Sequence, residues 1–372
     1  MSLVLKEVVS KKDLKNFIKF PFKLYKGNPY YVPPLVEFEM STLRKDKNPA
    51  FDHADAKYWI VQRDGETVGR IAAITLDSEL KEKSLARFGW IDFIDDHEVS
   101  ALLLETAKKW AESKGATSIH GPMGFTDLDF EGALISGYDE LATQATIYNY
   151  PYYIDHLKAW GLETAATWVE LRGKVPEEIP KKIDRSVNII KKRFKLSVKE
   201  FKSTKEILNY APGVFEVLNE AYANLYGYQA LTPKQIDYYV DQYFGFIRKE
   251  FVCIIVNEHD EVIGFGLTLP SLSKAFQKAK GSLFPFGFIH VLKAFYFSDL
   301  ADMFLIGIKP EYQRTGASAL MFHHLKKVYD AKGIKYVASG PMLADNNHVL
   351  NLWNQFDMNI GNIKRSCFIK HF

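Results

Sequence analysis

The most informative segment of the chain reads Lys309-Pro310-Glu311-Tyr312-Gln313-Arg314-Thr315-Gly316-Ala317-Ser318. Before it, the apolar run Met303–Ile308 predicts a strand, and after it the periodicity of Ala319–Ala331 predicts a helix. Small residues at the turn let several backbone N–H groups point to one place beside the helix N-terminus, where partial positive charge favours a diphosphate. Arg314 can add a charge-assisted contact. The order of strand, turn and helix therefore predicts an anion site, although the letters alone also fit an ordinary turn.

The elements around this segment occur twice in the same order, at a spacing of roughly 190 to 220 residues, far longer than the period of a solenoid repeat. Each half contains a hairpin with an acidic turn, a helix ended by Lys-Gly, a strand running into Gly-Pro-Met, and a final helix followed by a closing strand. The paired elements are Tyr58–Thr75 and Phe251–Leu269, Ser100–Gly115 and Ser318–Gly333, Gly121–Met123 and Gly340–Met342, Tyr150–Trp160 and Asn347–Phe356, and Thr167–Arg172 and Ile363–Phe372.

This repetition predicts two tandem domains, in agreement with a length of 372 residues, which exceeds what one hydrophobic core usually serves. We place the first domain at residues 1–175, a linking segment with a helix at 176–195, and the second domain at 196–372. The second copy carries an insertion, Ser271–Phe297, that contains Phe284-Pro285-Phe286-Gly287. A segment with so many aromatic residues is expected to pack against another part of the protein.

The segment Pro310–Ser318 resembles the acetyl-CoA loop of the GNAT superfamily of N-acetyltransferases, which usually reads Gln or Arg, two residues, Gly, one residue, then Gly or Ala. Gln313 and Gly316 match this pattern, and Ser318 departs mildly from it. The resemblance covers the second copy well and the first in outline, and the whole chain is similar to a bacterial group of tandem GNAT proteins. It implies an α/β (α+β) fold with two tandem GNAT-like domains, each a mixed, mostly antiparallel sheet flanked by helices. It also implies acetyl-CoA or another acyl-CoA as a substrate, and no metal.

The first copy differs at the position of the loop. Aligning Ser100 with Ser318 sets the acidic run Asp95-Asp96-His97-Glu98 against Gln313–Gly316. Carboxylates close to a diphosphate disfavour its binding. The first copy is therefore predicted to have a degenerate CoA site and to serve a structural or substrate-shaping role.

The resemblance assigns the contacts with CoA. In the GNAT pattern, the strand before the loop splays from its neighbour, and its free backbone groups bind the pantetheine arm and polarise the thioester carbonyl. The residues assigned to CoA are Gly307, Ile308, Gln313, Arg314, Thr315, Gly316, Ala317, Ser318 and Asn347.

The candidate base is one of two carboxylates. An attacking amine must be neutral, so an acidic side chain or a water relay usually removes its proton. Asp302 precedes the predicted strand, and Glu220 lies in the predicted helix Val214–Ala223. Either residue would also fit a solvated surface position.

The candidate acid is less well defined. GNAT enzymes commonly protonate the departing thiolate with a tyrosine on the last helix, but the corresponding position here is Trp353. An indole N–H cannot act as an acid near neutral pH, although it can donate a hydrogen bond to sulfur. Asn351 as a donor, Tyr312 or His348 as an acid, or no acid at all are the alternatives, and Trp353 also fits a core position.

Three tyrosines, Tyr222, Tyr226 and Tyr228, fall in the helix and loop that commonly frame the acceptor in this fold. They can line an acceptor pocket, or fill the interface between the two copies. Together with the Phe-rich insertion, they favour an acceptor or acyl chain of apolar character.

Composition excludes several classes of protein. The 48 basic and 45 acidic residues are interspersed and give a net charge of +3, so nucleic acid is not expected as a partner. The charged N-terminus does not resemble a signal peptide, and no run approaches the roughly 20 apolar residues that span a bilayer. We therefore expect a cytoplasmic protein without stable membrane insertion. Cys253 and Cys367 lack CxxC partners, so neither a disulfide framework nor a zinc site is predicted.

The function favoured by these patterns is transfer of an acyl group, in the first place acetyl, from CoA to the amine of a small molecule or peptide by direct attack. The first alternative is a non-catalytic acyl-CoA-binding or interaction protein, in which Trp353 marks lost catalysis. A second alternative is an aminoacyl or peptidyl transferase with a donor other than CoA. The segment Gln313–Ser318 argues against the second alternative, and the sequence favours no particular oligomeric state.

Overall fold

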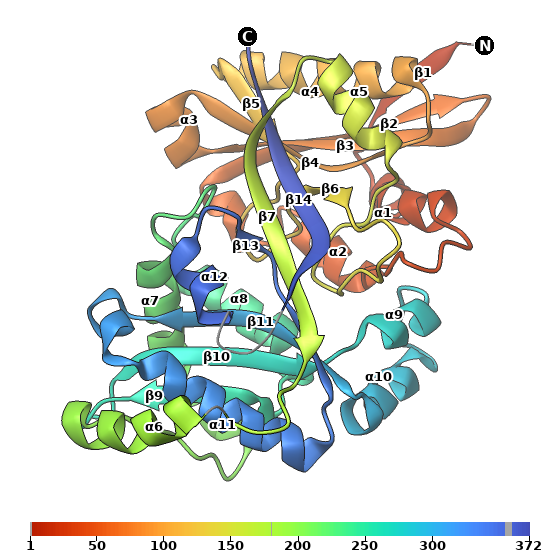
Figure 1. The fold of residues 1–372 in the computed structure, drawn as a ribbon. Helices are drawn as coiled ribbons and strands as arrows, with labels where there is room; N and C mark the ends of the chain where they lie inside the picture. Colours follow the sequence, from red (N-terminus) through yellow and green to blue (C-terminus); the bar gives the residue numbers. More distant parts are fainter. Residues whose placement is uncertain (1, 180, 354–358) are drawn as a thin grey trace. The chain divides into compact units, whose positions relative to one another are not determined.

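The computed structural model describes residues 2–179, 181–353 and 359–372 and divides the chain into two compact units. Unit 1 comprises Met1–Val169, Ser273–His290 and Asn362–Phe372. Unit 2 comprises Glu170–Leu272 and Val291–Gly361. Each unit is a sheet with helices packed on it (Figure 1).

In unit 1 the sheet runs in the order β1, β2, β3, β4, β5 and the end of β14. Among the strand pairs that the structure describes in this unit, only β4–β5 is parallel. The β2–β3 hairpin turns at Asp64 and Gly65, which both have positive φ as a tight hairpin turn requires. The strands are β1 Leu3–Glu7, β2 Ala54–Arg63, β3 Glu66–Leu76, β4 Leu85–Phe93, β5 Ser118–Gly121, β6 Ala133–Ser136 and β14 Asn359–His371.

The helices of unit 1 provide its two hydrophobic clusters. Helix α4 buries Val99, Leu103 and Ala107 against the sheet, and α1 buries Phe17 and Ile18 in a second cluster. Ser10 and Asp13 form a capping box that begins α1. The helices are α1 Lys11–Leu24, α2 Val36–Thr42, α3 Asp77–Lys83, α4 His97–Ser113, α5 Tyr152–Ala159 and α9 Ser273–Ala279, with a short 3-10 helix at Pro49–Asp52.

In unit 2 the sheet runs in the order β8, β9, β10, β11, β12 and the end of β7, and its parallel pair is β11–β12. This is the same pattern of pairing as in unit 1, which confirms the predicted duplication of the fold. The strands are β7 Glu163–Lys174, β8 Ser197–Val198, β9 Val252–Val256, β10 Val262–Pro270, β11 Leu300–Ile308, β12 Tyr336–Ser339 and β13 Met342–Leu343.

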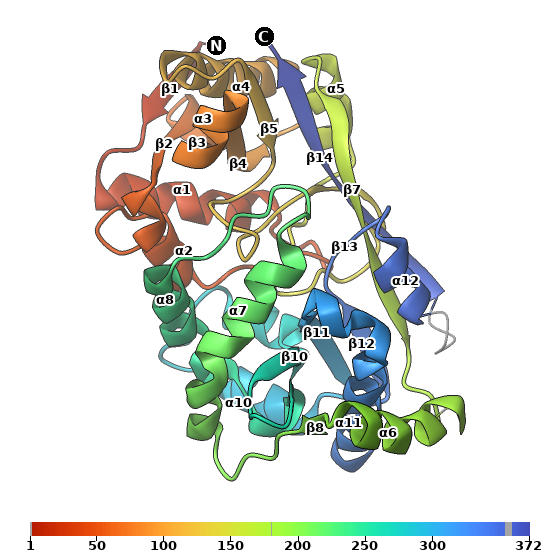
Figure 2. The same cartoon turned by 90° about the vertical axis from the view of Figure 1, so that its left-hand side faces the viewer.

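The core of unit 2 lies between the sheet and two helices that pack together, α6 and α11 (Figure 1). Helix α6 contributes Ile183, Val187 and Ile190, so the predicted linking helix is part of the core. Figure 2 shows α7 running beside β10 and β11. The helices are α6 Lys181–Phe194, α7 Ala211–Tyr222, α8 Pro233–Tyr243, α11 Ala317–Lys332 and α12 Asn347–Trp353, with 3-10 helices at Thr204–Tyr210, Phe244–Phe246, Lys249–Phe251 and Pro310–Thr315. Helix α10, Gly287–Phe297, begins in unit 1 and continues into unit 2 from Val291.

The predicted fold class is confirmed, because both sheets are mixed, mostly antiparallel and covered by helices. Gly115 and Gly333 have positive φ just after α4 and α11, which confirms their role in ending these helices. The final helix was predicted to reach Phe356, but α12 is described only to Trp353, and residues 354–358 lie outside the described part.

The sequence predicted that the last strand of each copy pairs within its own copy, and the structure differs from this prediction. Arg172–Lys174 of β7 pair with β12 of unit 2, whereas Phe368–His371 of β14 pair with β5 of unit 1. Both strands are long, at 12 and 13 residues, and each begins in one unit and ends in the other. The prediction that each copy keeps its own closing strand is therefore wrong. The units also differ from the ranges 1–175 and 196–372 because Ser273–His290 of the insertion belongs to unit 1.

Two further findings concern membranes and metals in the part of the chain that the structure describes. No helix in this part of the chain combines the length and the apolarity needed to cross a membrane. Within residues 2–179, 181–353 and 359–372, no cluster of three or more His, Cys, Asp or Glu side chains could hold a metal ion. Cys253 and Cys367 are both buried free thiols.

Candidate functional site

The predicted anion loop lies between β11 and α11 as expected. A 3-10 turn, Pro310–Thr315, follows β11, and Gly316 has a φ of 86° before α11 begins at Ala317. The Thr315 hydroxyl donates to the carbonyl of Tyr312 at 2.7 Å, and the Gln313 amide donates to the carbonyl of Ile308 at 3.2 Å. No side chain caps the N-terminus of α11 among the described residues. The backbone N–H of Ala319 already donates to the carbonyl of Gly316 at 2.8 Å, so the N–H groups before it are those left for an external acceptor such as a phosphate.

The corresponding helix of unit 1 is capped by its own carboxylate. The side chain of Asp96 accepts hydrogen bonds from the backbone N–H groups of Glu98 and Val99, at 2.9 and 3.4 Å. Asp96 also pairs with Arg63 at 2.6 Å, and this hydrogen bond lowers its pKa, with burial acting in the opposite direction. Asp95 lies 3.0 Å from His156. A charged carboxylate thus caps the N-terminus of α4, whereas no described side chain caps that of α11.

Strand β11 contains a bulge near its middle. Its parallel pairing with β12 covers Leu300–Met303, and the described register does not continue beyond Met303. On the other side, β10 pairs with Met303 and then with Leu305, so Phe304 is an extra residue in β11. The second half of β11, which contains the predicted Gly307 and Ile308, therefore has one edge away from β12. The pairing ends where β12 itself ends at Ser339, and the splayed arrangement that the GNAT resemblance implies stays a prediction.

Helix α7 contacts this part of β11 through a tyrosine. The hydroxyl of Tyr222 donates a hydrogen bond of 3.1 Å to the main-chain carbonyl of Ile306. The ring of Tyr222 meets that of Tyr228 edge to face at 5.7 Å, and the Tyr228 hydroxyl donates to Asn219 at 2.7 Å. Tyr226 lies half-buried in the loop that follows α7. The structure thus brings Tyr222 and Tyr228 together beside the second half of β11.

Helix α6 packs beside the loop that precedes α11. A Cβ atom at Gly316 would lie 2.8 Å from Cδ1 of Ile190 and 3.3 Å from its Cγ1. The positive φ of Gly316 adds a second reason why only glycine fits here. The sequence does not predict this contact, because the apolar spacing of Ile183, Val187 and Ile190 indicates a buried helix face without identifying its partner.

Asp302, one of the two candidate bases, lies within β11 and is only 4% exposed. Ala301 and Met303 on either side of it face the core beneath α11, so Asp302 points to the opposite face of the sheet. Burial raises the pKa of Asp302 to about 7, and Ser271 and Arg172 oppose this rise. A carboxyl group with such a pKa can accept a proton near neutral pH.

Glu220, the other candidate, is exposed on α7 and lies 3.5 Å from the ammonium group of Lys309. Lys309 also pairs with Glu216 at 2.6 Å. Hydrogen bonding to Glu216 is the main cause that raises the pKa of Lys309. Glu220 is thus one partner of an exposed ion-pair network, whereas Asp302 is isolated from solvent.

Trp353 is a core residue of unit 2, at 3% exposure. Its indole N–H donates to the sulfur of Met342 at 3.2 Å, and its ring meets Phe322 edge to face at 5.2 Å. Asn347 and Asn351 are exposed on the same helix, and Tyr312 packs at the margin of the core. The side chain of His348 lies outside the described part of the structure. Trp353 therefore already donates its N–H within the protein.

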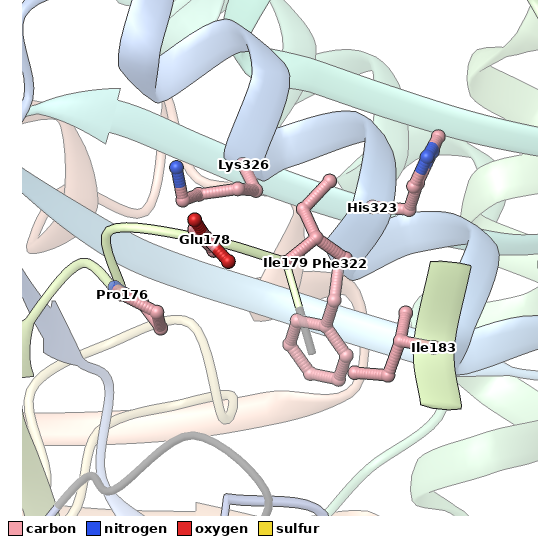
Figure 3. A pocket seen from close by; sticks show the side chains of 7 residues that line it. All are labelled: Pro176, Glu178, Ile179, Ile183, Phe322, His323 and Lys326. Atoms are coloured by element: carbon pink, nitrogen blue, oxygen red, sulfur yellow. The ribbon is translucent and has the colours of Figure 1, made fainter. Parts of the chain in front are cut away.

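A small hollow opens on another side of α11 (Figure 3). Its volume is about 230 Å³, including the part open to solvent. None of the predicted site residues contributes to its lining. The residues that line it are Pro176, Glu178, Ile179, Ile183, Phe322, His323 and Lys326.

Comparison with known proteins gives two relatives of similar length. The chain is 29% identical over 321 residues to Protein YghO of Escherichia coli (strain K12), covering 82% of this chain and 78% of that protein. It is 26% identical over 312 residues to the bacterial ceramide synthase of Caulobacter vibrioides (strain NA1000 / CB15N), covering 81% of this chain and 79% of that protein. No model of a known protein family matches the chain.

Solved structures resemble the chain along its whole length. A tandem GNAT protein from the clavulanic acid biosynthesis pathway matches with a TM-score of 0.57 and 11% identity, covering 100% of this chain and 98% of that one. A GCN5-related N-acetyltransferase from Sphaerobacter thermophilus matches with a TM-score of 0.52 and 10% identity, covering 99% of this chain and 95% of that one. The glucosamine N-acetyltransferase region of a fungal multi-domain β-N-acetylglucosaminidase matches with a TM-score of 0.58 and 13% identity, covering 99% and 38%. At these identities the comparisons concern the fold.

Proposed function

Because the chain has the tandem GNAT fold, we propose that it is an acyl-CoA-dependent N-acyltransferase whose one CoA site is the β11–α11 loop of unit 2. The observation that carries this proposal is the difference between the two helix N-termini. Helix α11 has no side-chain cap, whereas Asp96 caps α4. The acetyltransferase neighbours and the ceramide synthase relative support acyl transfer in general.

The proposed binding mode follows the order of elements along the loop. The diphosphate of CoA lies at the N-terminus of α11, where Arg314 is exposed and can approach it. The pantetheine arm runs along the open edge of β11, past Ile308 and Gly307 toward the bulge at Phe304. Backbone N–H groups of this edge polarise the thioester carbonyl, as oxyanion-binding groups do.

In the proposed reaction, the nitrogen of a neutral amine attacks the thioester carbon, the C–S bond breaks, and an amide and CoA thiolate are formed. The proton lost by the amine passes to Asp302, directly or through water. Asp302 lies two residues before Phe304, about 7 Å along the strand, and its pKa is raised to about 7. We assign no acid to Trp353, because its N–H is bound to Met342. A thiolate with a pKa of about 8.5 can leave without an acid.

For the acceptor, we propose an amine with an apolar portion. Tyr222 and Tyr228 lie together beside β11 and provide aromatic surface near the proposed thioester position. The relative from Caulobacter vibrioides is named a ceramide synthase, and a ceramide is the amide of a long-chain amino alcohol. Both observations favour a lipophilic amine over a polar one.

The test is calorimetric titration of the purified chain with CoA, acetyl-CoA and a long-chain acyl-CoA, followed by mass spectrometry of mixtures with polar and long-chain amines. We expect one site per chain, and formation of an amide together with free CoA. Binding of acyl-CoA without product from any amine would favour the non-catalytic acyl-CoA-binding protein. The absence of binding would contradict the proposal.

A further inference from the structure

Helix α10 and the loop before it expose a continuous set of apolar side chains. Phe284 and Phe286 in the loop are 72% and 70% exposed, and Tyr296 near the end of the helix is 76% exposed. Monomeric proteins rarely leave several large apolar side chains exposed side by side. We call this surface the α10 face and define it by Phe284, Phe286, Phe288, Ile289, Leu292 and Tyr296.

These side chains do not belong to the face of α10 that packs on the protein. The inward positions are Gly287 and Val291, which are buried, and Phe295, which is half-buried, at a spacing of one helical turn. The α10 face lies on the remaining sides of the helix. Because α10 is apolar around nearly its whole circumference, its outer sides are expected to be covered in the functional state.

The charged side chains of the segment that contains the α10 face are basic, and the exposed Asp299 follows this segment. Between Val262 and Ser298 the sequence contains no Asp or Glu, but it contains four lysines and one histidine. Lys274, Lys278, Lys280 and Lys293 are all exposed. The whole chain, in contrast, carries nearly equal numbers of basic and acidic residues, 48 and 45. An apolar surface beside an excess of lysines is complementary to a layer of anionic head groups above acyl chains.

We propose that the α10 face docks the protein on the surface of a bilayer that contains anionic phospholipids. Helix α10 has 11 residues, well below the roughly 20 needed to span a membrane, so it would lie in the interfacial plane. In this position the aromatic side chains enter the boundary between head groups and acyl chains, and the lysines contact the head groups.

The charge pattern argues against a second copy of the chain as the occupant. A two-fold symmetric dimer brings the same surface together from both partners. Lysines would then face lysines, and the nearest acidic residue after the helix, Asp299, would balance only part of their charge. An anionic bilayer meets both the apolar and the basic part of the surface.

The experiment is co-sedimentation of the full chain with vesicles of phosphatidylcholine alone and of phosphatidylcholine and phosphatidylglycerol in equal parts. The double variant Phe284→Ser/Phe286→Ser removes apolar side chains from an exposed loop. Its matched control is Val9→Ser, because Val9 is 79% exposed but lies in β1's flanking segment, outside the α10 face. The wild type and the control are expected to sediment with the anionic vesicles, and the double variant to bind about tenfold less tightly or worse.

A charge variant tests the second component of the surface. Lys280→Glu is expected to weaken binding to anionic vesicles by about fivefold or more, and added salt should reduce this difference. Calorimetric CoA binding by each variant serves as the check on folding, and it separates loss of docking from loss of the proposed activity.

Two results would overturn the proposal. The first is equal sedimentation of the wild type and the double variant, including the case in which neither binds vesicles. The second is a wild type that is dimeric by analytical ultracentrifugation and does not bind vesicles, together with a monomeric double variant. That result would assign the α10 face to contact between copies of the chain.

Discussion

Cδ1 of Ile190 on α6 lies only 2.8 Å from the position that a Cβ atom on Gly316 would occupy, directly before the first turn of α11. Through this contact, a helix predicted as a linker from the sequence determines which residue can occupy the loop of the proposed CoA site. The relationship links the stability of unit 2 to the geometry of that loop, and it can be tested by substitution at both positions.

Gly316→Ala should lower the free energy of unfolding by about 2 kcal/mol or more, because it adds a Cβ at positive φ and a contact with Ile190. Ile190→Val alone should cost about 1 kcal/mol. In the double variant the loss of Cδ1 relieves part of the contact, so the two effects should be less than additive in urea unfolding. Strict additivity would mean that Ile190 and Gly316 do not touch.

Asp96→Asn in unit 1 should leave acyl-CoA affinity unchanged, because the proposed site lies in unit 2. Asp96→Ala should lower the free energy of unfolding by about 1 kcal/mol through loss of the α4 cap. Because the pKa of Asp96 is lowered in the folded state, chiefly by Arg63, its carboxylate contributes stability above its unfolded pKa of about 3.9, and this contribution is lost as the pH falls through the folded value. The comparison of denaturation at neutral and acidic pH measures it, and gain of CoA binding by Asp96→Asn would show that unit 1 retains a second site.

Asp302→Asn should abolish the rise of kcat/KM with pH that is expected near pH 7 in the wild type. The pKa of Asp302 is raised in the folded state, so this carboxyl group loses its proton at a lower pH in the unfolded chain than in the folded one. The free energy of unfolding therefore falls as the pH rises from about 4 to about 7. The variant should therefore be more stable than the wild type at pH values above about 7, and nearly equal near pH 4. A variant with full activity and an unchanged pH profile would remove Asp302 from the mechanism.

Trp353→Phe should leave kcat within a small factor of the wild type, because the indole packs in the core and its N–H is bound to Met342. The loss of one hydrogen bond and some packing should cost about 1 to 2 kcal/mol of stability, measured by urea unfolding. If instead kcat fell about a hundredfold with little change in stability, Trp353 would act on the departing thiolate.

The sequence predicted the architecture of each unit, because order and spacing of local signals survive in a duplicated fold. The β11–α11 loop, the hairpins and the helix-ending Gly115 and Gly333 all follow from turn chemistry and periodicity. Tandem GNAT structure, inferred from the segment Pro310–Ser318, is confirmed by the solved neighbour.

The exchange of β7 and β14 could not be predicted in this way, because the alternation that identifies a strand does not say which sheet edge it joins. Similarly, no pattern marks Phe304 as a bulged residue, since the bulge depends on the register with β10. The chemistry of Trp353 was predictable from its indole group, whereas its burial against Phe322 required the fold. The catalytic and CoA-binding assignments themselves stay predictions.

The most direct test of the account is a pair of substitutions at Ser318, in the first turn of α11. Ser318→Asp places a carboxylate in the first turn of α11, comparable to the carboxylate of Asp96 at the N-terminus of α4, and because an acid near a helix N-terminus is favourable, the fold should be retained. Ser318→Asn has nearly the same shape without the charge. In calorimetric titration with acyl-CoA, Ser318→Asn should bind nearly as the wild type does, and Ser318→Asp should bind roughly ten- to a hundredfold more weakly. Equal affinity of the two variants would show that the diphosphate of CoA does not bind at α11, and would contradict the proposed site.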